Sequence, residues 1–144
     1  MNYHRLMNKL KEIFPFENYI KENSGGDAYQ TVFSIATKYL PEKSNVLDFG
    51  SGPCDKTAVV SLLGHNCIAY DDMQDEWHKK SDNGRKILEF SKNMGIQYFN
   101  TQEVDVNSQT TAFDMIMLND VIEHLHESPK DILLPMLELL KDDG

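Results

Sequence analysis

Apolar residues recur at two different spacings along the chain. Near the amino terminus, Leu6, Leu10 and Ile13 repeat every three to four residues, which predicts an amphipathic helix over 3–14. Later, short apolar runs such as 46–49 are bounded by Asp, Asn or Gly and are typical of strands buried on both faces of a sheet. The pattern therefore predicts helices and buried strands in one chain.

The predicted helices and strands alternate along most of the chain. A second leading helix begins after Asp27, a good N-cap residue, and ends before Pro41. Strands are predicted over 46–49, 67–70, 96–99 and 113–118, and helices over 55–63, 85–94 and 129–141, the last one capped by Ser128. The polar segment 73–84 is expected to be irregular. Strands separated by helical segments predict an α/β fold with a parallel sheet.

The chain divides into a helical lead-in over 1–44 and an α/β core over 45–144. After the last predicted helix the sequence ends in a turn, and we expect the core to stop before a fifth strand. One edge of the fourth strand is then open, and open edges promote association. The chain is therefore either a piece of a longer protein, which we favour, or covered there by a partner such as a second copy in a homo-oligomer.

The composition is that of a single soluble globular domain. The chain has 144 residues, of which 40% are hydrophobic and 26% are charged. No apolar run approaches the roughly 20 residues of a membrane helix, and the amino terminus lacks the apolar core of a signal peptide. We therefore expect a cytoplasmic protein without a membrane partner. The two cysteines, Cys54 and Cys67, lack the CxxC spacing of zinc sites, and we expect neither a zinc site nor a disulfide framework.

The net charge is −9 and is unevenly distributed. Residues 1–45 carry a net charge of +1, whereas residues 46–144 carry −10. A surface of this sign repels the phosphate backbone of nucleic acids, so we expect no nucleic-acid partner. It suits a cationic ligand, or it serves solubility alone.

The segment VLDFGSGPC, residues 46–54, carries the strongest functional signal. An apolar strand ends in an acid, and a glycine-rich turn then leads into a helix. This geometry receives nucleotide-like ligands at the carboxyl edge of a parallel sheet. A dinucleotide site with the pattern G-x-G-x-x-G would require glycine at position 55. Asp55 stands there and would repel a pyrophosphate, so the pattern disfavours a dinucleotide.

A cofactor without phosphates fits this turn better. S-adenosylmethionine carries a sulfonium cation and an ammonium group, which Asp48 near the end of the first strand would attract. Asp71 follows the second predicted strand, and its carboxylate can accept hydrogen bonds from both ribose hydroxyls. Gly50 and Gly52 would let the backbone approach the cofactor closely.

Four segments in this order resemble the class I, Rossmann-like S-adenosylmethionine-dependent methyltransferases. VLDFGSGPC resembles the glycine-rich first motif, with Cys54 in place of the last glycine, and CIAYDD resembles the second-strand motif with its ribose-binding acid. FDMIMLNDVIEHL resembles the fourth-strand segment, and SPKDILLPMLELLKDDG resembles the helix and turn before the fifth strand. The resemblance covers 46–144 and implies a doubly wound, mainly parallel sheet with strand order 3-2-1-4.

The resemblance also implies which residues bind the cofactor. Its methionine end is expected at Asp48, Gly50, Ser51 and Gly52, its ribose at Asp71, and its adenosine at Asp72 and Met73. The adenine is expected at Asp105 and Val106, with Glu103 as the rival, and Asn119 is expected to line the mouth where the methyl group is transferred. The residues that follow Asn119 differ from the Asn-Pro-Pro-aromatic signature, which disfavours methylation of an amino group on adenine or glutamine.

The motifs alone identify no catalytic residue. His124 follows the fourth predicted strand, where substrate would approach, and is the candidate general base, with a structural role as the alternative. The spacing of Asp72, Asp75 and His78 could hold a metal, but a solvated loop is the simpler interpretation, so we expect no metal. Trp77 in the same segment is either a lid over the cofactor or a plug under the loop.

Together these features predict an S-adenosylmethionine-dependent methyltransferase that acts on a small-molecule or sugar-type acceptor. Two alternatives stay open. The chain could be a non-catalytic methyltransferase-like domain that binds the cofactor or a partner chain, or it could be an NAD-dependent or nucleotide-sugar oxidoreductase.

Overall fold

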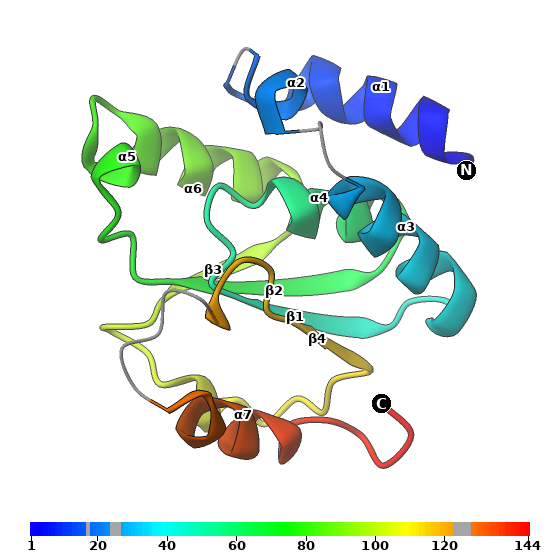
Figure 1. The fold of residues 1–144 in the computed structure, drawn as a ribbon, viewed down its shortest axis with the longest axis vertical. Coiled ribbons are helices and arrows are strands. Elements are labelled where there is room, and N and C mark those ends of the chain that lie inside the picture. The colour runs from blue at the N-terminus through cyan, green and yellow to red at the C-terminus, as the bar shows by residue number, and fades with distance from the viewer. Residues whose placement is uncertain (17, 24–26, 123–127) are drawn as a thin grey trace.

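The computed structural model describes residues 1–16, 18–23, 27–122 and 128–144. At its centre is a four-stranded sheet made of β1 (Asn45–Phe49), β2 (Asn66–Asp71), β3 (Gln97–Asn100) and β4 (Met115–Met117). Neighbouring strands are parallel, and their order is β3-β2-β1-β4 (Figure 1). The predicted α/β class and the strand order 3-2-1-4 are confirmed.

Helices cover both faces of the sheet. They are α1 (Tyr3–Ile13), α2 (Tyr19–Asn23), α3 (Ala28–Tyr39), α4 (Asp55–Leu62), α5 (Glu76–Lys79), α6 (Asn83–Asn93) and α7 (Pro129–Leu137), with the 3-10 turn η1 (Val106–Ser108). Figure 1 shows α1, α3, α4 and α6 on one side of the sheet and α7 on the other. None of the described helices is long and apolar enough to cross a membrane.

Each face of the sheet has its own hydrophobic cluster. Because side chains alternate along a strand, neighbouring residues of β1 belong to different clusters. Val46 packs with residues of α1, α3, α4 and α6, whereas Leu47 packs with Tyr70 and Phe113 on the opposite face. Leu140, which follows α7, packs against this second cluster. The sheet is therefore buried from both sides, as its apolar strands require.

The lead-in over 1–44 contributes directly to the first cluster. Its buried members there are Leu6, Met7, Leu10, Phe14, Ile20, Tyr29, Val32 and Ala36. Helices α1 and α3 both contact α4, which lies directly after the glycine turn. Residues 1–44 and the α/β core over 45–144 thus share one hydrophobic interior.

The segment 73–84, expected to be irregular, contains the short helix α5 and the beginning of α6. Asp75 begins α5 by accepting a hydrogen bond from the backbone N–H of Trp77 at 2.6 Å. The side chain of Asn83 donates to the Trp77 carbonyl at 2.8 Å. Polar side chains therefore organise this segment through hydrogen bonds to the backbone, which hydrophobic spacing does not reveal.

The end of the chain also differs from the prediction. Helix α7 is shorter than expected, and Leu140 lies beside Phe113 in a parallel bridge. The Phe113 N–H donates to the Leu139 carbonyl at 2.9 Å, and the Lys141 N–H donates to the Phe113 carbonyl at 2.9 Å. The side of the fourth strand that the sequence left open is therefore covered at its start. Among the described residues, Met115–Met117 pairs only with β1, and association of two copies there stays a prediction.

Candidate functional site

A cavity of about 630 Å³ opens at the carboxyl edge of the sheet, where the parallel strands end. Its walls come from the glycine turn after β1, the turn after β2, helix α5 and the segment after β4. The predicted site residues that line it are Asp48, Gly50, Ser51, Gly52, Asp71, Asp72 and Asn119. The fold thus brings distant parts of the sequence to one cavity of the size that small ligands occupy.

Asp48 lies in β1 and is only 1% exposed. Its Oδ2 accepts a hydrogen bond from the Thr57 hydroxyl at 2.5 Å, whereas Oδ1 is buried without a hydrogen-bond partner among the described residues. Burial raises the pKa of Asp48 to about 7, and the hydrogen bond from Thr57 opposes this only in part. A cation in the cavity would satisfy Oδ1 and favour the charged carboxylate.

The glycine turn lies close to the segment after β4 because residue 50 has no side chain. Gly50 has a φ of +73°, in the left-handed region that favours glycine. Its N–H donates to the Tyr70 carbonyl at 2.7 Å, which fixes the turn on β2. A Cβ at this position would lie 2.4 Å from Cγ2 of Val121. Glycine is therefore required by the backbone and by the close approach together.

Cys54 stands where the first motif of the resembling family has its last glycine. It keeps the left-handed backbone, with a φ of 62°, and its side chain is fully buried. Its Sγ lies 3.7 Å from Oγ of Ser51 and 3.8 Å from Oγ of Ser91. Burial raises the pKa of the thiol to about 12, so the side chain is a neutral packing group at physiological pH.

Asp55, the residue that disfavours a dinucleotide, accepts a hydrogen bond from a residue of the lead-in. It is the first residue of α4, is 4% exposed and lines the cavity. The hydroxyl of Tyr29 in α3 donates to its Oδ2 at 2.5 Å. Burial, reinforced by the Asp55 carboxylate, raises the pKa of Tyr29 well above its usual value, so the phenol stays protonated. Helix α3 therefore fixes one wall of the cavity through a buried hydrogen bond.

Asp71 ends β2 and ties two turns together. Its Oδ2 accepts a hydrogen bond from the Gly52 N–H at 2.8 Å, and its Oδ1 accepts one from the Met73 N–H at 2.8 Å. Each carboxylate oxygen can accept a further hydrogen bond. The residue predicted to hold the ribose is therefore fixed in orientation and keeps acceptor capacity towards the cavity that it lines.

Three predicted site residues do not line this cavity. The side chain of Met73 packs against the first hydrophobic cluster, and that of Val106 packs against the second. Asp105 is exposed and begins η1 by accepting a hydrogen bond from the Asn107 N–H at 2.9 Å. Thr101 contributes to the wall after β3 instead. A role for Asp105 and its neighbours at the adenine stays a prediction, as does the role of His124, which lies outside the described residues.

Trp77 lines the cavity, and its ring packs on Phe16, with 4.7 Å between the ring centroids. Its role as a lid or as a plug stays a prediction. The neighbouring His78 lines the cavity as well. Of the described part of the chain, no group of three or more His, Cys, Asp or Glu side chains is arranged to hold a metal ion.

Tyr19, Lys56 and Asp120 line the cavity although no sequence pattern singled them out as ligand contacts. Lys56 is paired with Asp120, with 2.8 Å between Nζ and Oδ2. Asp120 follows Asn119 after the fourth strand, so the rule that ligands bind at carboxyl ends could have identified it. Tyr19 reaches the site through its packing on Trp77, which the sequence does not show.

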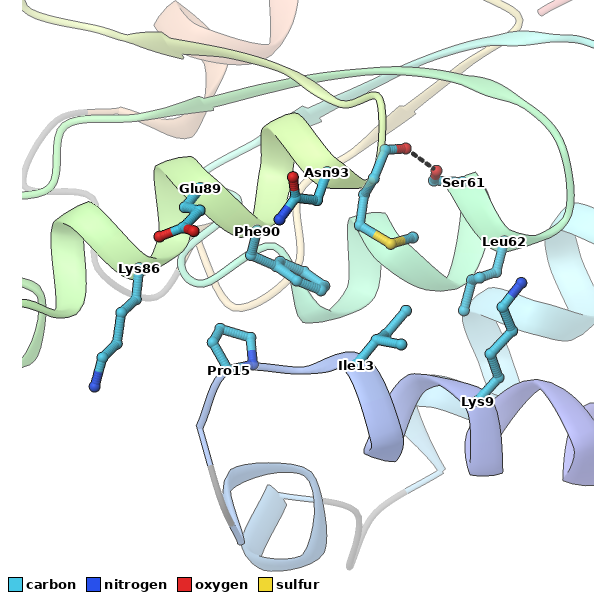
Figure 2. A pocket seen from close by; sticks show the side chains of 10 residues that line it. Lys9, Ile13, Pro15, Ser61, Leu62, Lys86, Glu89, Phe90 and Asn93 are labelled. Carbon is cyan, nitrogen blue, oxygen red and sulfur yellow. Dashed lines mark hydrogen bonds between the residues drawn. The ribbon is translucent and has the colours of Figure 1, made fainter.

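A second cavity, of about 770 Å³, lies away from the sheet edge between α1, α4 and α6. Figure 2 shows Ile13 and Pro15 on one side of it and Phe90 of α6 on the other. Beside it, the hydroxyl of Ser61 donates to the Met94 carbonyl at 3.0 Å. None of the predicted site residues lines this second cavity. The cavity at the carboxyl edge is therefore the candidate site, although it is the smaller of the two.

The fold and the glycine turn agree with a comparison of the sequence with known families. Residues 24–144 match a family described as a methyltransferase domain. The match covers most of the chain and includes every described element that lines the cavity except α2. The chain belongs to this methyltransferase-domain family. Among curated proteins, no sequence matches the chain.

Solved methyltransferase structures share the fold. The precorrin-6Y C5,15-methyltransferase from Geobacter metallireducens aligns with a TM-score of 0.59 at 12% identity, covering 81% of this chain and 58% of that chain. A TehB-like S-adenosylmethionine-dependent methyltransferase from Corynebacterium glutamicum aligns with a TM-score of 0.58 at 18% identity, covering 99% of this chain and 71% of that chain. The plantazolicin methyltransferase BpumL, solved with S-adenosylhomocysteine, aligns with a TM-score of 0.55 at 14% identity, covering 96% of this chain and 59% of that chain.

At these identities the likeness shows the fold. The chain spans 58% of the precorrin methyltransferase and 59% of BpumL, which is less than two thirds of either. The names of two of them give different acceptors, a precorrin and plantazolicin, so these solved structures do not agree on one acceptor.

Proposed function

We propose that the chain binds S-adenosylmethionine in the cavity at the carboxyl edge and transfers its methyl group to a small-molecule or sugar-type acceptor. The observation that carries this proposal is the buried Oδ1 of Asp48, a residue that lines the cavity, because this oxygen has no hydrogen-bond partner among the described residues. An acid in that position attracts a cation and repels a phosphate.

The residues around the cavity suit the parts of this cofactor. Asp48, with the glycine turn at Gly50, Ser51 and Gly52, would hold the cationic methionine end. Asp71 would accept the ribose hydroxyls with its remaining lone pairs, and Asp72 would border the adenosine. Asn119 would line the mouth where the acceptor enters. Membership of the methyltransferase-domain family supports these roles.

The chemistry needs positioning more than proton transfer. The sulfonium activates the methyl carbon for an in-line displacement by the acceptor. The protein has to hold the two reacting atoms close and aligned, which supplies much of the acceleration in such reactions. The rigid anchoring of the glycine turn through Gly50, Gly52 and Asp71 serves this purpose.

Ligand titrations test the proposal. We expect S-adenosylmethionine and S-adenosylhomocysteine to raise the melting temperature and to give saturable heats in calorimetry, whereas NAD should do neither. Stabilisation by NAD alone would contradict the proposal and favour an oxidoreductase. Binding of S-adenosylhomocysteine with no turnover on any acceptor would favour a non-catalytic binding domain.

A further inference from the structure

The part of the cavity near α5 has an aromatic wall. Tyr19 and Trp77 both line the cavity, and their ring centroids lie 5.4 Å apart. Phe16 packs on Trp77 at 4.7 Å between centroids and supports this wall from behind. Aromatic faces attract organic cations through their π electrons, and tryptophan does so most strongly.

Carboxylates surround the aromatic wall. Asp55, Asp75 and Asp120 line the same cavity as Tyr19, and burial raises the pKa of Tyr19 with a further contribution from these carboxylates. Among the described lining residues, Lys56 alone brings a positive charge, and its Nζ is already paired with Asp120. The potential in this part of the cavity therefore favours a cation.

Buried polar atoms on the cavity wall also lack partners. Both ring nitrogens of His78 and the Nδ2 of Asn119 are buried, and none of them has a hydrogen-bond partner within the described ranges. Leaving such atoms unpaired is costly, so a ligand that satisfies them gains affinity. A neutral imidazole has one acceptor nitrogen, which can accept a hydrogen bond from an ammonium group.

We propose that this wall binds the methyl acceptor and that the acceptor is a small organic amine, which arrives as its ammonium cation. The inference rests on the proposed function and names the chemical class of its acceptor. Tyr19 and Trp77 hold the organic part and the charge, Asp55 and Asp75 supply the negative field, and Asp120 offsets the charge of Lys56. His78 accepts the hydrogen bond.

Methyl transfer to an amine conserves atoms and charge with the groups that the cavity supplies. The ammonium first gives one proton to His78, which leaves a lone pair on nitrogen. The nitrogen then attacks the methyl carbon. A carbon–nitrogen bond forms while the carbon–sulfur bond breaks, and the electron pair of that bond stays on sulfur. The methylated nitrogen is again cationic, and the proton on His78 passes to solvent.

A matched pair of ligands tests the site by calorimetry. Choline and 3,3-dimethylbutanol have the same shape, but only choline carries a charge. In protein saturated with S-adenosylhomocysteine, which occupies the cofactor part of the cavity, we expect choline to bind at least about tenfold more tightly. Equal affinities, or binding of choline only without S-adenosylhomocysteine, would overturn the inference. Titration of S-adenosylhomocysteine alone tests the proposed function, so the two can fail separately.

Two substitutions separate the aromatic and the ionic contributions. Trp77→Leu should weaken choline binding by about tenfold, whereas Trp77→Phe should retain most of it. Asp120→Asn removes a charge at a position with a φ of 55°, which asparagine tolerates, and should weaken choline binding by a similar factor. Asp142→Asn makes the same charge change at an exposed position outside the cavity and is the control. Wild-type choline affinity in Trp77→Leu and Asp120→Asn would overturn the inference.

Turnover on a second matched pair tests the acceptor atom. With S-adenosylmethionine present, we expect mass spectrometry to detect methylated phenethylamine but no methylated phenethyl alcohol. His78→Gln should slow this reaction and shift its pH profile while choline still binds. Methylation of the alcohol at the same rate as the amine would overturn the inference.

Discussion

The Asp48 carboxyl is buried, and among the described residues only one of its two oxygens has a hydrogen-bond partner. Its pKa in the folded chain is about 7, against an ordinary value of 3.8. Between these values, the folded carboxyl keeps a proton that the unfolded one has released. The stabilisation from this proton is therefore fully present below pH 3.8 and is lost as the pH rises through 7.

We predict that Asp48→Asn removes this part of the pH dependence of stability. Between pH 3.8 and 7, the free energy of unfolding should fall as the pH rises. The fall should be steeper in the wild-type protein than in the variant, by up to about 1.4 kcal/mol per pH unit. Urea unfolding at several pH values between about 4 and 7 measures the difference. Asn keeps an acceptor for the Thr57 hydroxyl, and parallel curves for the two proteins would contradict the raised pKa.

Asp71 has two tasks, because its oxygens hold the Gly52 and Met73 N–H groups and still face the cavity. We predict that Asp71→Ala lowers the affinity for S-adenosylhomocysteine at least about tenfold, in line with the loss of hydrogen bonds to a charged acceptor. Isothermal titration calorimetry measures the affinity for S-adenosylhomocysteine, with Asp142→Ala as the control. Unchanged affinity would remove Asp71 from the site.

Gly50 offers a test of the close approach between the glycine turn and the segment after β4. Gly50→Ala should destabilise the fold by about 2–4 kcal/mol, because alanine is strained at this φ and its Cβ overlaps Val121. In the double variant with Val121→Ala, the overlap is relieved and part of the loss should return. Chemical denaturation measures both, and a double variant no better than the sum of the two single losses would argue against the contact.

At the scale of elements, α3 and α4 are joined by apolar packing and by a buried hydrogen bond from Tyr29 to Asp55. We predict that Tyr29→Phe destabilises the protein by about 1–3 kcal/mol, because the Asp55 carboxylate is left buried without this donor. Tyr39→Phe in the same helix is the matched control, since Tyr39 is 65% exposed. Equal urea midpoints for the two variants would show that the Tyr29 hydroxyl contributes nothing.

The strands could be predicted from the sequence because each contains a short apolar run, and β1 and β2 carry buried residues on both faces of the sheet. Helix α5 could not, since it depends on the Asp75 carboxylate accepting from the Trp77 N–H and on the Asn83 side chain donating to the Trp77 carbonyl. The shortened α7 could not either, because Leu140 pairs with Phe113, a residue far away in the sequence.

The same division holds for the candidate site. Asp48, Gly50 and Asp71 stand in short motifs at strand ends, where a parallel sheet places ligand contacts, and the structure gathers them at one cavity. Tyr19 and Trp77 meet only through packing between α2 and α5, so local spacing could not pair them. The motifs thus identified the lining residues at the strand ends and missed the aromatic wall of Tyr19 and Trp77.

At the scale of the whole molecule, one hydrophobic interior spans the lead-in and the α/β core. We predict that a chain of residues 45–144 alone does not unfold cooperatively. It lacks buried side chains such as Leu6, Leu10 and Tyr29. Each contributes about 1.5–3 kcal/mol, and a domain's net stability is only about 5–15 kcal/mol. Thermal unfolding followed by circular dichroism tests this, and a sharp transition in the shortened chain would show that the core folds independently.

The position of Trp77 has a practical consequence for every binding experiment on this protein. The chain contains one tryptophan, and it lines the candidate cavity. Its fluorescence therefore responds to changes at that cavity, without labelling and without background from a second indole. A ligand that displaces water from the ring should shift the emission to shorter wavelengths, so the protein carries its own optical sensor of occupancy.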